Sequence, residues 1–335
     1  MGGEAIVLTR DPSGLPPELA ARDPHLAQLD VLRLAPDDAT RAAELLRGRV
    51  AVSSVRDGAA IDASGVQIPR VLDALYAASA AQARLGPVWN EGRPILAVWA
   101  PTAQSVRVLL WPDGTGEGTP ERRAMTRDDA SGVWSVRGDR SWTGRAYRYE
   151  LEVYHPAVQA TTVLDATDPY ATALTRDSRH ALLVDLDDPA TMPPGWTELA
   201  KPGVEAPEDA VVYELHVRDF SAVASDVPEE LRGRYGAFTL AESVGMSHLR
   251  GLAEAGVTHL HLLPTFDITT VPEDPADRRE PDLPDVPRPS ASPAPQAAIE
   301  AVRDRDAFNW GYDPLHFTVP EGSGSPSPTP CPCGL

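Results

Sequence analysis

The sequence predicts a multidomain chain in which an immunoglobulin-like β-sandwich precedes a unit of alternating strands and helices. Two patterns support this prediction. Residues 93–188 contain short β-branched and aromatic runs separated by Pro/Asp/Gly turns, which is typical of a sandwich of about 100 residues. From residue 208 the pattern becomes strand, helix, strand, which predicts two parallel strands joined by a right-handed crossover.

The N-terminal region, residues 1–88, carries no motif that indicates chemistry. Its apolar clusters at 26–32 and 42–46 are compatible with helices. Residues 68–76 predict a helix with one apolar face, formed by Val71, Leu72, Leu75 and Tyr76. The region begins abruptly, so we expect it to be part of a larger N-terminal region.

The second region, residues 89–195, is the predicted sandwich. Its expected strands are residues 95–100, 106–111, 133–136 and 147–154. The stretch 187–203 holds four prolines and is expected to be the linker that closes this domain.

The third region, residues 205–322, holds the strand–helix–strand pattern. We expect a strand over 211–220, a helix over 243–255 and a strand over 257–263. Gly256 lies where a helix C-terminal cap is expected, because glycine readily adopts the left-handed conformation. The residues after Pro264, up to Asp306, are acidic and rich in proline without periodicity, which predicts a long loop.

The last residues, 323–335, consist largely of Pro, Ser, Gly and Cys. This composition is what GC-rich DNA gives when it is translated out of frame, and a natural disordered tail is the alternative. The two cysteines, Cys331 and Cys333, lie here. They are too close in sequence for an ordinary disulfide and too few for a structural zinc site.

The net charge and the hydropathy of the sequence restrict the kinds of partner that the chain can bind. The net charge of −19 argues against a nucleic acid or an anionic membrane, because both require clustered Lys and Arg. No run reaches the roughly 18 apolar residues of a membrane-spanning helix. The N-terminus lacks the features of a signal peptide, so the chain as given is expected in the cytoplasm, although a full-length relative can be secreted.

Three blocks of sequence, in this order, resemble pullulanase-type α-1,6-glucosidases of glycoside hydrolase family 13. Residues 98–103, with 132–134, 147–150 and 167–171, resemble the family 48 carbohydrate-binding module. Residues 213–220 and 258–264 are similar to the first two strands of the (β/α)8 barrel. The hexapeptide Asn309-Trp310-Gly311-Tyr312-Asp313-Pro314 is typical of pullulanases. The resemblance therefore implies an N-terminal fragment that ends in the truncated start of a TIM barrel.

The resemblance implies retaining hydrolysis, in which a nucleophilic carboxylate and a carboxylic acid lie about 5–5.5 Å apart. In these barrels the acids lie near the ends of the fourth, fifth and seventh strands, whereas this chain reaches only the second. We therefore assign no catalytic residue and expect the chain to be inactive alone. Glu214 and Asp219 are expected to be scaffold groups.

The hexapeptide supplies the candidate substrate-binding residues, which are Asn309, Trp310, Tyr312 and Asp313. By resemblance, Tyr312 stacks on the glucosyl unit next to the scissile bond and Asp313 hydrogen-bonds nearby site residues. An aromatic ring suits the apolar face of a sugar. The alternative is that Trp310 and Tyr312 only anchor a loop.

Tryptophans on sandwich strands more often fill a core than bind sugar. We assign Trp99 and Trp134 to the core, and keep Trp111 and Trp142 as candidate glucan contacts.

The histidines that could suggest a metal site are His216, His259 and His261. Nothing completes a coordination pattern around them, so structural hydrogen bonding is favoured and no metal or cofactor is predicted. A calcium site in the acidic run 273–285 is left open.

The resulting hypothesis is a portion of a starch-debranching enzyme with an α-glucan (pullulan, starch or glycogen) as its partner. Two alternatives stay open: a non-catalytic α-glucan-binding protein, and one piece of a split enzyme that a second polypeptide completes. The sequence predicts no oligomeric state.

Overall fold

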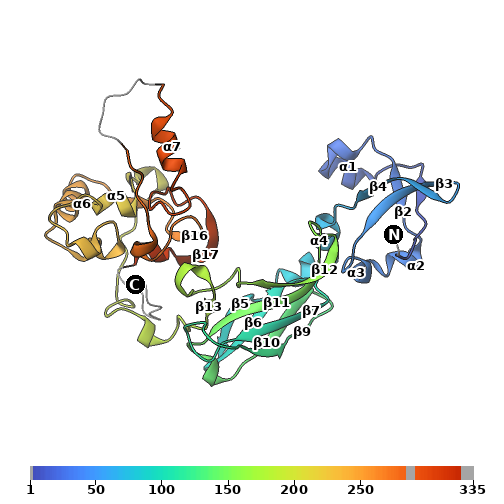
Figure 1. Cartoon of the computed structure of the whole chain (residues 1–335), viewed down its shortest axis with the longest axis horizontal. Coiled ribbons are helices and arrows are strands. Elements are labelled where there is room, and N and C mark those ends of the chain that lie inside the picture. The colour runs from blue at the N-terminus through green and yellow to red at the C-terminus, as the bar shows by residue number, and fades with distance from the viewer. Residues whose placement is uncertain (1–2, 284–290, 326–335) are drawn as a thin grey trace.

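The computed structural model describes residues 3–283 and 291–325. Three parts follow one another in sequence order along its long axis (Figure 1). These are an N-terminal part of short elements, a central β-sandwich and a C-terminal part of mixed helices and strands. The longest helix in the described residues has 12 residues, and none of them is long and apolar enough to cross a membrane.

The N-terminal part contains short helices and two antiparallel strand pairs. Its elements are β1 Thr9–Asp11, α1 Pro17–Arg22, β2 Val31–Arg33, α2 Pro36–Ala39, α3 Ala42–Leu45, β3 Ala51–Arg56, β4 Ala59–Gly65 and α4 Pro69–Ala80. Helix α3 confirms the helix expected at 42–46. The helix expected across 26–32 is wrong, because residues 31–33 pair with β1. The β3–β4 hairpin turns at Asp57 and Gly58, both with positive φ, as is typical of Asp-Gly pairs in tight hairpins.

Helix α4 confirms the helix predicted at 68–76, but its buried face is narrower than expected. Tyr76 is buried, whereas Val71 and Leu75 are exposed. The Tyr76 hydroxyl accepts a hydrogen bond of 3.1 Å from Arg127 Nη2, and the Arg127 guanidinium also lies 5.8 Å from the centre of the Tyr76 ring. One side chain therefore joins α4 to the sandwich.

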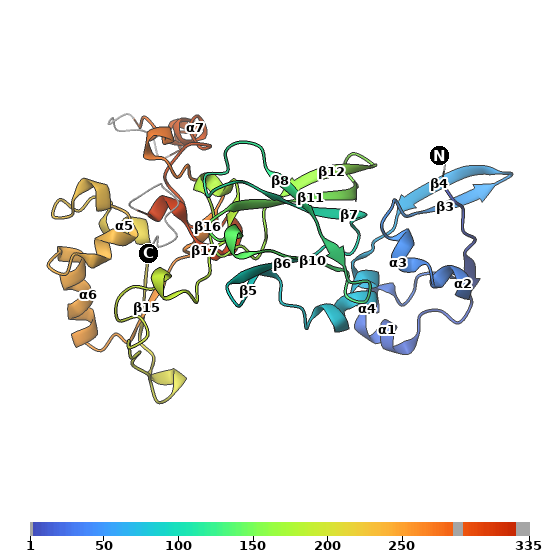
Figure 2. The same ribbon diagram turned by 90° about the horizontal axis from the view of Figure 1, so that it is seen from below.

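The central part is an antiparallel sandwich of two sheets, which lie face to face in Figure 2. Its strands are β5 Gly86–Asn90, β6 Arg93–Trp99, β7 Ser105–Leu110, β8 Glu121–Ala124, β9 Thr126–Arg127, β10 Val133–Arg137, β11 Ala146–His155, β12 Ala160–Ala166 and β13 Ala181–Leu182. The sheets have the orders β5-β6-β10-β9 and β12-β11-β7-β8, with β13 on β11. The four strands predicted from sequence are confirmed.

Alternation along the strands decides which tryptophans reach the core. Trp134 on β10 is buried among the core side chains, as predicted. Trp99 is 37 % exposed, so its assignment to the core is wrong. It follows the buried Val98 on β6, and neighbouring residues of a strand point to opposite faces. The Trp99 indole Nε1 donates to the Ser131 carbonyl at 2.9 Å.

A buried carboxylate organises the end of the sandwich. Asp168 Oδ2 accepts hydrogen bonds from the hydroxyls of Tyr147 at 2.8 Å and Tyr149 at 2.9 Å. Asp168 Oδ1 accepts from the Tyr170 backbone N–H at 2.8 Å. Burial raises the pKa of Asp168 and also raises the pKa of both tyrosines. The hydrogen bonds compensate for much of the desolvation of this group.

The C-terminal part contains the predicted strand–helix–strand unit. Its elements are β14 Val212–Leu215, α5 Val217–Ser221, α6 Val244–Glu254, β15 His259–Leu262, β16 Phe266–Ile268, α7 Ala294–Glu300 and β17 Pro314–Pro320. Strands β14 and β15 pair in parallel. Ser243 Oγ caps α6 by accepting from the Met246 N–H at 3.2 Å, and Gly256 has φ of 105° just after the helix. The unit is therefore confirmed.

Two expectations for this part are wrong. The strand expected over 211–220 ends at Leu215, because His216 Nδ1 accepts from the Arg218 N–H at 3.1 Å and starts helix α5. The loop expected from 264 to 306 contains β16 and α7. Strand β16 has three residues and pairs with β17, far along the chain, so local periodicity could not reveal it.

The C-terminal part is fastened to the sandwich through β16 and β17. His316 on β17 and Asp267 on β16 are both 1 % exposed and lie 2.7 Å apart through Nδ1 and Oδ2. His316 Nε2 lies 2.8 Å from Thr167 Oγ1, and Asp267 Oδ1 accepts from Ser178 Oγ at 2.5 Å. Val319 joins the core of the sandwich. These four polar residues (Thr167, Ser178, Asp267 and His316) are called the junction network below.

The junction network predicts the effect of Asp267→Ala. Removal of the carboxylate deprives the buried His316 and Ser178 of their shared partner, which costs about 1–3 kcal/mol. We expect a lower free energy of unfolding in urea and faster proteolysis within residues 205–325. Asp304→Ala is the matched control, because the Asp304 side chain is 92 % exposed. Equal unfolding free energies for the two variants would contradict the proposed role of the network.

Candidate functional site

Two adjoining cavities lie where β14 and β15 end. Ligands of parallel α/β structures usually bind at the carboxyl ends of the strands. His216, which follows β14, lines both cavities. The first, of about 350 Å³, is called the arginine pocket. The second, of about 690 Å³, is called the aromatic groove, and its lining includes Tyr213, Phe220, His248, Trp310 and Tyr312.

The hexapeptide turns sharply at Gly311. Its φ is +78°, and a Cβ atom at this position would lie 2.5 Å from the carbonyl oxygen of Pro264. Only glycine fits here without displacing the segment that follows β15. The turn leaves the flanking rings in solvent, with Trp310 58 % and Tyr312 66 % exposed. The backbone thus holds two aromatic rings at the edge of the aromatic groove.

The four predicted substrate-binding residues do not share one cavity. Trp310 and Tyr312 line the aromatic groove. Asn309 lines the arginine pocket, and its Nδ2 donates to the Ala307 carbonyl at 3.2 Å. Asp313 is exposed and lines neither cavity, and its backbone carbonyl accepts from the Thr269 N–H at 3.3 Å.

Further aromatic residues surround Trp310. The rings of Phe308 and Trp310 meet edge to face, with centroids 5.8 Å apart. The Arg218 guanidinium lies 5.7 Å from the centre of the Phe308 ring, within range of a cation–π interaction. Phe308 is 52 % exposed. Sequence reasoning missed Phe308, and the only signal that could have found it is its place directly before the hexapeptide.

The sandwich tryptophans proposed as glucan contacts are buried, so this prediction is wrong. Trp142 is 4 % exposed and folds into the main core beside Gly138, where a Cβ atom would lie 2.5 Å from the indole. Trp111 is 8 % exposed, because the segment around β13 covers this face of the sheet. The His180 ring lies 4.3 Å from it, centroid to centroid. Neither indole can stack on a sugar.

The three histidines considered for a metal site have separate surroundings. His216 caps α5, and His259 Nδ1 lies 2.8 Å from Thr258 Oγ1. His261 is exposed on β15. Across residues 3–283 and 291–325, no three His, Cys, Asp or Glu side chains are arranged to hold a metal ion. The histidine with a buried carboxylate partner is instead His316, which the sequence did not single out.

Glu214 and Asp219 are exposed and line the aromatic groove. Asp219 forms an ion pair of 3.1 Å with Arg218. The structure therefore gives neither of them a buried environment.

Two carboxyl groups with raised pKa values, those of Glu273 and Glu321, lie beside the arginine pocket. Burial, followed by the charges of Glu321, Asp177 and Asp267, raises the pKa of Glu273 to about 7. Burial also raises the pKa of Glu321, whose two carboxylate oxygens accept from the Ile268 and Ser323 N–H groups at 2.9 Å each. Burial and repulsion among these groups together favour a proton on Glu273 up to neutral pH.

Comparisons with known proteins show which chains this one resembles. Residues 1–74 match the model of the pullulanase N2 domain, and residues 84–171 match carbohydrate-binding module 48, the isoamylase N-terminal domain. The pullulanase of Klebsiella pneumoniae is 36 % identical over 93 % of this chain. The chain is homologous to pullulanases. Chloroplastic pullulanase 1 of Arabidopsis thaliana is 37 % identical over 95 % of the chain.

The same relationship holds for solved pullulanase structures. The crystal structure of Klebsiella pneumoniae pullulanase complexed with maltotriose superposes with a TM-score of 0.88 at 33 % identity, over 98 % of this chain and 34 % of that one. The chain spans 32 % and 33 % of the length of the two curated pullulanases. Its similarity is therefore to about one third of a pullulanase.

The raised pKa of Glu273 predicts how stability depends on pH in this pullulanase homologue. The unfolded chain loses the proton near pH 4.5 and the folded chain near pH 7, so the folded form binds more protons between these values. The free energy of unfolding is therefore expected to fall as the pH rises from 4.5 to 7. Above pH 7 the ionisation of Glu273 causes no further change. Glu273→Gln should remove this fall and exceed the wild type by about 1–2 kcal/mol at pH 8, since the carboxyl is only partly buried.

Urea unfolding at pH 4, 6 and 8 measures this effect. Glu208→Gln, which replaces an exposed acid, should follow the wild type at each pH. A difference between Glu273→Gln and the wild type that is the same at all three pH values would contradict the assignment.

The turn at Gly311 gives a second prediction. Gly311→Ala introduces both a strained φ and a close contact with the Pro264 carbonyl, and is expected to cost about 1–3 kcal/mol. Gly203→Ala is the control, because its Cβ atom meets nothing within 4 Å and its φ is not positive. Thermal unfolding would separate the two variants. A Gly311→Ala protein as stable as Gly203→Ala would show that the turn has room for a side chain.

Proposed function

We propose that this chain forms the N-terminal, glucan-binding portion of a starch-debranching enzyme that hydrolyses α-1,6 linkages by a retaining mechanism. The observation that carries the proposal is the exposed pair Trp310 and Tyr312, held by Gly311 beside the carboxyl ends of two parallel strands. Homology to pullulanases over almost the whole chain supports it. So does the maltotriose complex of the Klebsiella pneumoniae enzyme.

The aromatic groove suits a neutral oligosaccharide. Its volume of about 690 Å³ lies within the range of small-molecule sites. Sugar rings present C–H faces that pack on aromatic rings, while their hydroxyls need polar partners. His216, Asp219 and His248 also line the groove and offer such partners. We therefore propose an α-glucan, such as a segment of pullulan, starch or glycogen, as the ligand.

Strands β14 and β15 are proposed to be the first two strands of a (β/α)8 barrel. A parallel sheet is normally covered on both faces, yet Val212 is 56 %, Leu260 47 % and Leu262 39 % exposed. Further strands and helices would cover these side chains. This observation also keeps the split-enzyme alternative, in which a second polypeptide supplies them. No carboxylate of the described residues is proposed as nucleophile or general acid.

Binding to maltotriose tests the glucan proposal. In isothermal titration, Tyr312→Ala and Trp310→Ala should each weaken binding roughly tenfold, which corresponds to about 1.4 kcal/mol. Tyr170→Ala and Trp196→Ala are matched controls, since these rings are 47 % and 55 % exposed outside the aromatic groove. Equal losses in the controls, or no binding by the wild type, would reject the groove as a glucan site.

Hydrolysis is tested separately. The purified 335-residue chain is expected to release no maltotriose from pullulan, because the acids of the retaining mechanism are assigned to other strands of the barrel. Release of maltotriose by the purified chain would overturn this part of the proposal and would require a catalytic pair among its own residues.

A further inference from the structure

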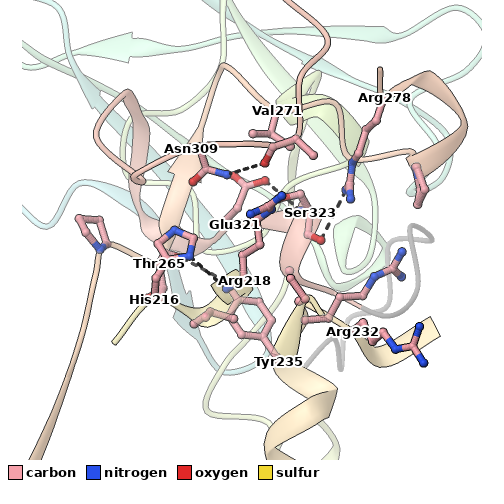
Figure 3. Close-up of a pocket in the computed structure, with 18 of the residues that line it drawn as sticks. His216, Arg218, Arg232, Tyr235, Thr265, Val271, Arg278, Asn309, Glu321 and Ser323 are labelled. Atoms are coloured by element: carbon pink, nitrogen blue, oxygen red, sulfur yellow. Dashed lines mark hydrogen bonds between the residues drawn. The ribbon is translucent and has the colours of Figure 1, made fainter. Parts of the chain in front are cut away.

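The arginine pocket differs in charge from the rest of the molecule. The chain has a net charge of −19, yet four arginines and only two acidic residues line this pocket. The arginines are Arg218, Arg232, Arg234 and Arg278, and the acids are Glu280 and Glu321. They come from segments far apart in the sequence, and Figure 3 shows several of them around the cavity. The fold therefore gathers positive charge at this place.

Neutral acceptors hold two of these arginines in position. Arg278 donates to the carbonyls of Pro272 at 2.7 Å and Glu273 at 3.0 Å, and more weakly to Ser323. Arg232 Nε donates to the Val227 carbonyl at 2.8 Å. Within the described part of the chain, neither Arg232 nor Arg278 forms an ion pair. Backbone carbonyls orient the two guanidinium groups and leave their charge without a carboxylate in contact.

Two of the acids near these arginines are Glu321 and Glu273. Both carboxylate oxygens of Glu321 accept backbone N–H bonds, and Glu273 favours its protonated form up to neutral pH. Burial, followed by the charge of Arg234, lowers the pKa of Arg278, while the charges of Glu321, Asp274 and Glu273 partly oppose this effect. Two like charges in a partly buried cavity repel each other, and a bound anion would relieve this repulsion.

We propose that the arginine pocket binds the phosphate group of a small ligand. Planar guanidinium forks match the oxygens of phosphate, and such charge-assisted hydrogen bonds are stronger than neutral ones. Asn309, Thr265 and Tyr235 also line the pocket and add neutral polar groups. The volume of about 350 Å³ accommodates a phosphate group together with part of the molecule that carries it.

The neighbouring cavity indicates which kind of molecule carries the phosphate group. His216 lines both the arginine pocket and the aromatic groove, so a sugar on Trp310 or Tyr312 can extend a phosphate group toward the arginines. This part of the inference, a phosphorylated glucan, rests on the proposed function. Binding of the phosphate group itself does not.

Isothermal titration at constant ionic strength tests the inference with three probes: inorganic phosphate, glucose 6-phosphate and maltotriose. We expect saturable binding of inorganic phosphate, at least roughly tenfold weaker in Arg232→Gln and in Arg278→Gln. Arg278→Lys retains the charge without the fork and should bind with intermediate affinity. Arg303→Gln, on an exposed arginine outside the pocket, should match the wild type. Thermal unfolding of each variant verifies that it is folded.

The outcomes separate the two proposals. Tighter binding of glucose 6-phosphate than of inorganic phosphate, with the difference lost in Trp310→Ala, would support a sugar-borne phosphate. Equal binding of the two would support free phosphate as the ligand. Absence of saturable phosphate binding, or equal affinity in a folded Arg232→Gln/Arg278→Gln variant, would overturn the inference. Failure of maltotriose to bind would instead count against the glucan proposal alone.

Discussion

The arrangement of the C-terminal part depends on one buried contact, between His316 and Asp267. Both side chains are almost fully enclosed, and their remaining hydrogen-bonding atoms are satisfied by Thr167 and Ser178 of the sandwich. A buried charged or polar group is tolerated only with such partners. The contact therefore fixes strands β16 and β17 against the sandwich, and with them the segment that leads into both cavities.

The contact between His316 and Asp267 also supports the candidate site on the side that faces the sandwich. The hexapeptide leads directly into β17, and Gly311 lets it pass closely over Pro264 at the exit of β15. Aromatic rings are thereby presented on a backbone that is held at Gly311 and by β17. Preorganisation of this kind lowers the entropy that a ligand must remove on binding. The exposed faces of β14 and β15, by contrast, have no such support from the described residues.

The fold also separates a cluster of positive charge from the acidic remainder of the molecule. An excess of acids gives the chain its large negative charge, while arginines held by backbone carbonyls gather around one cavity. Beside that cavity, burial and repulsion from neighbouring acids raise the pKa of Glu273 to about 7, and burial also raises the pKa of Glu321. A protonated Glu273 leaves the neighbouring positive charge less compensated, which links the junction of the two parts to the electrostatics of the candidate site.

The amino-acid sequence was sufficient to predict the similarity to pullulanases, the sandwich strands and the parallel strand–helix–strand unit, because these depend on local periodicity and contiguous motifs. It could not place Trp111 and Trp142, whose burial depends on a covering segment and on an inward turn. Nor could it reveal β16, the junction network or the arginine pocket. Thr167 and His316 lie 149 residues apart in sequence, and such contacts arise only when the folded chain brings together side chains whose partners are not encoded nearby.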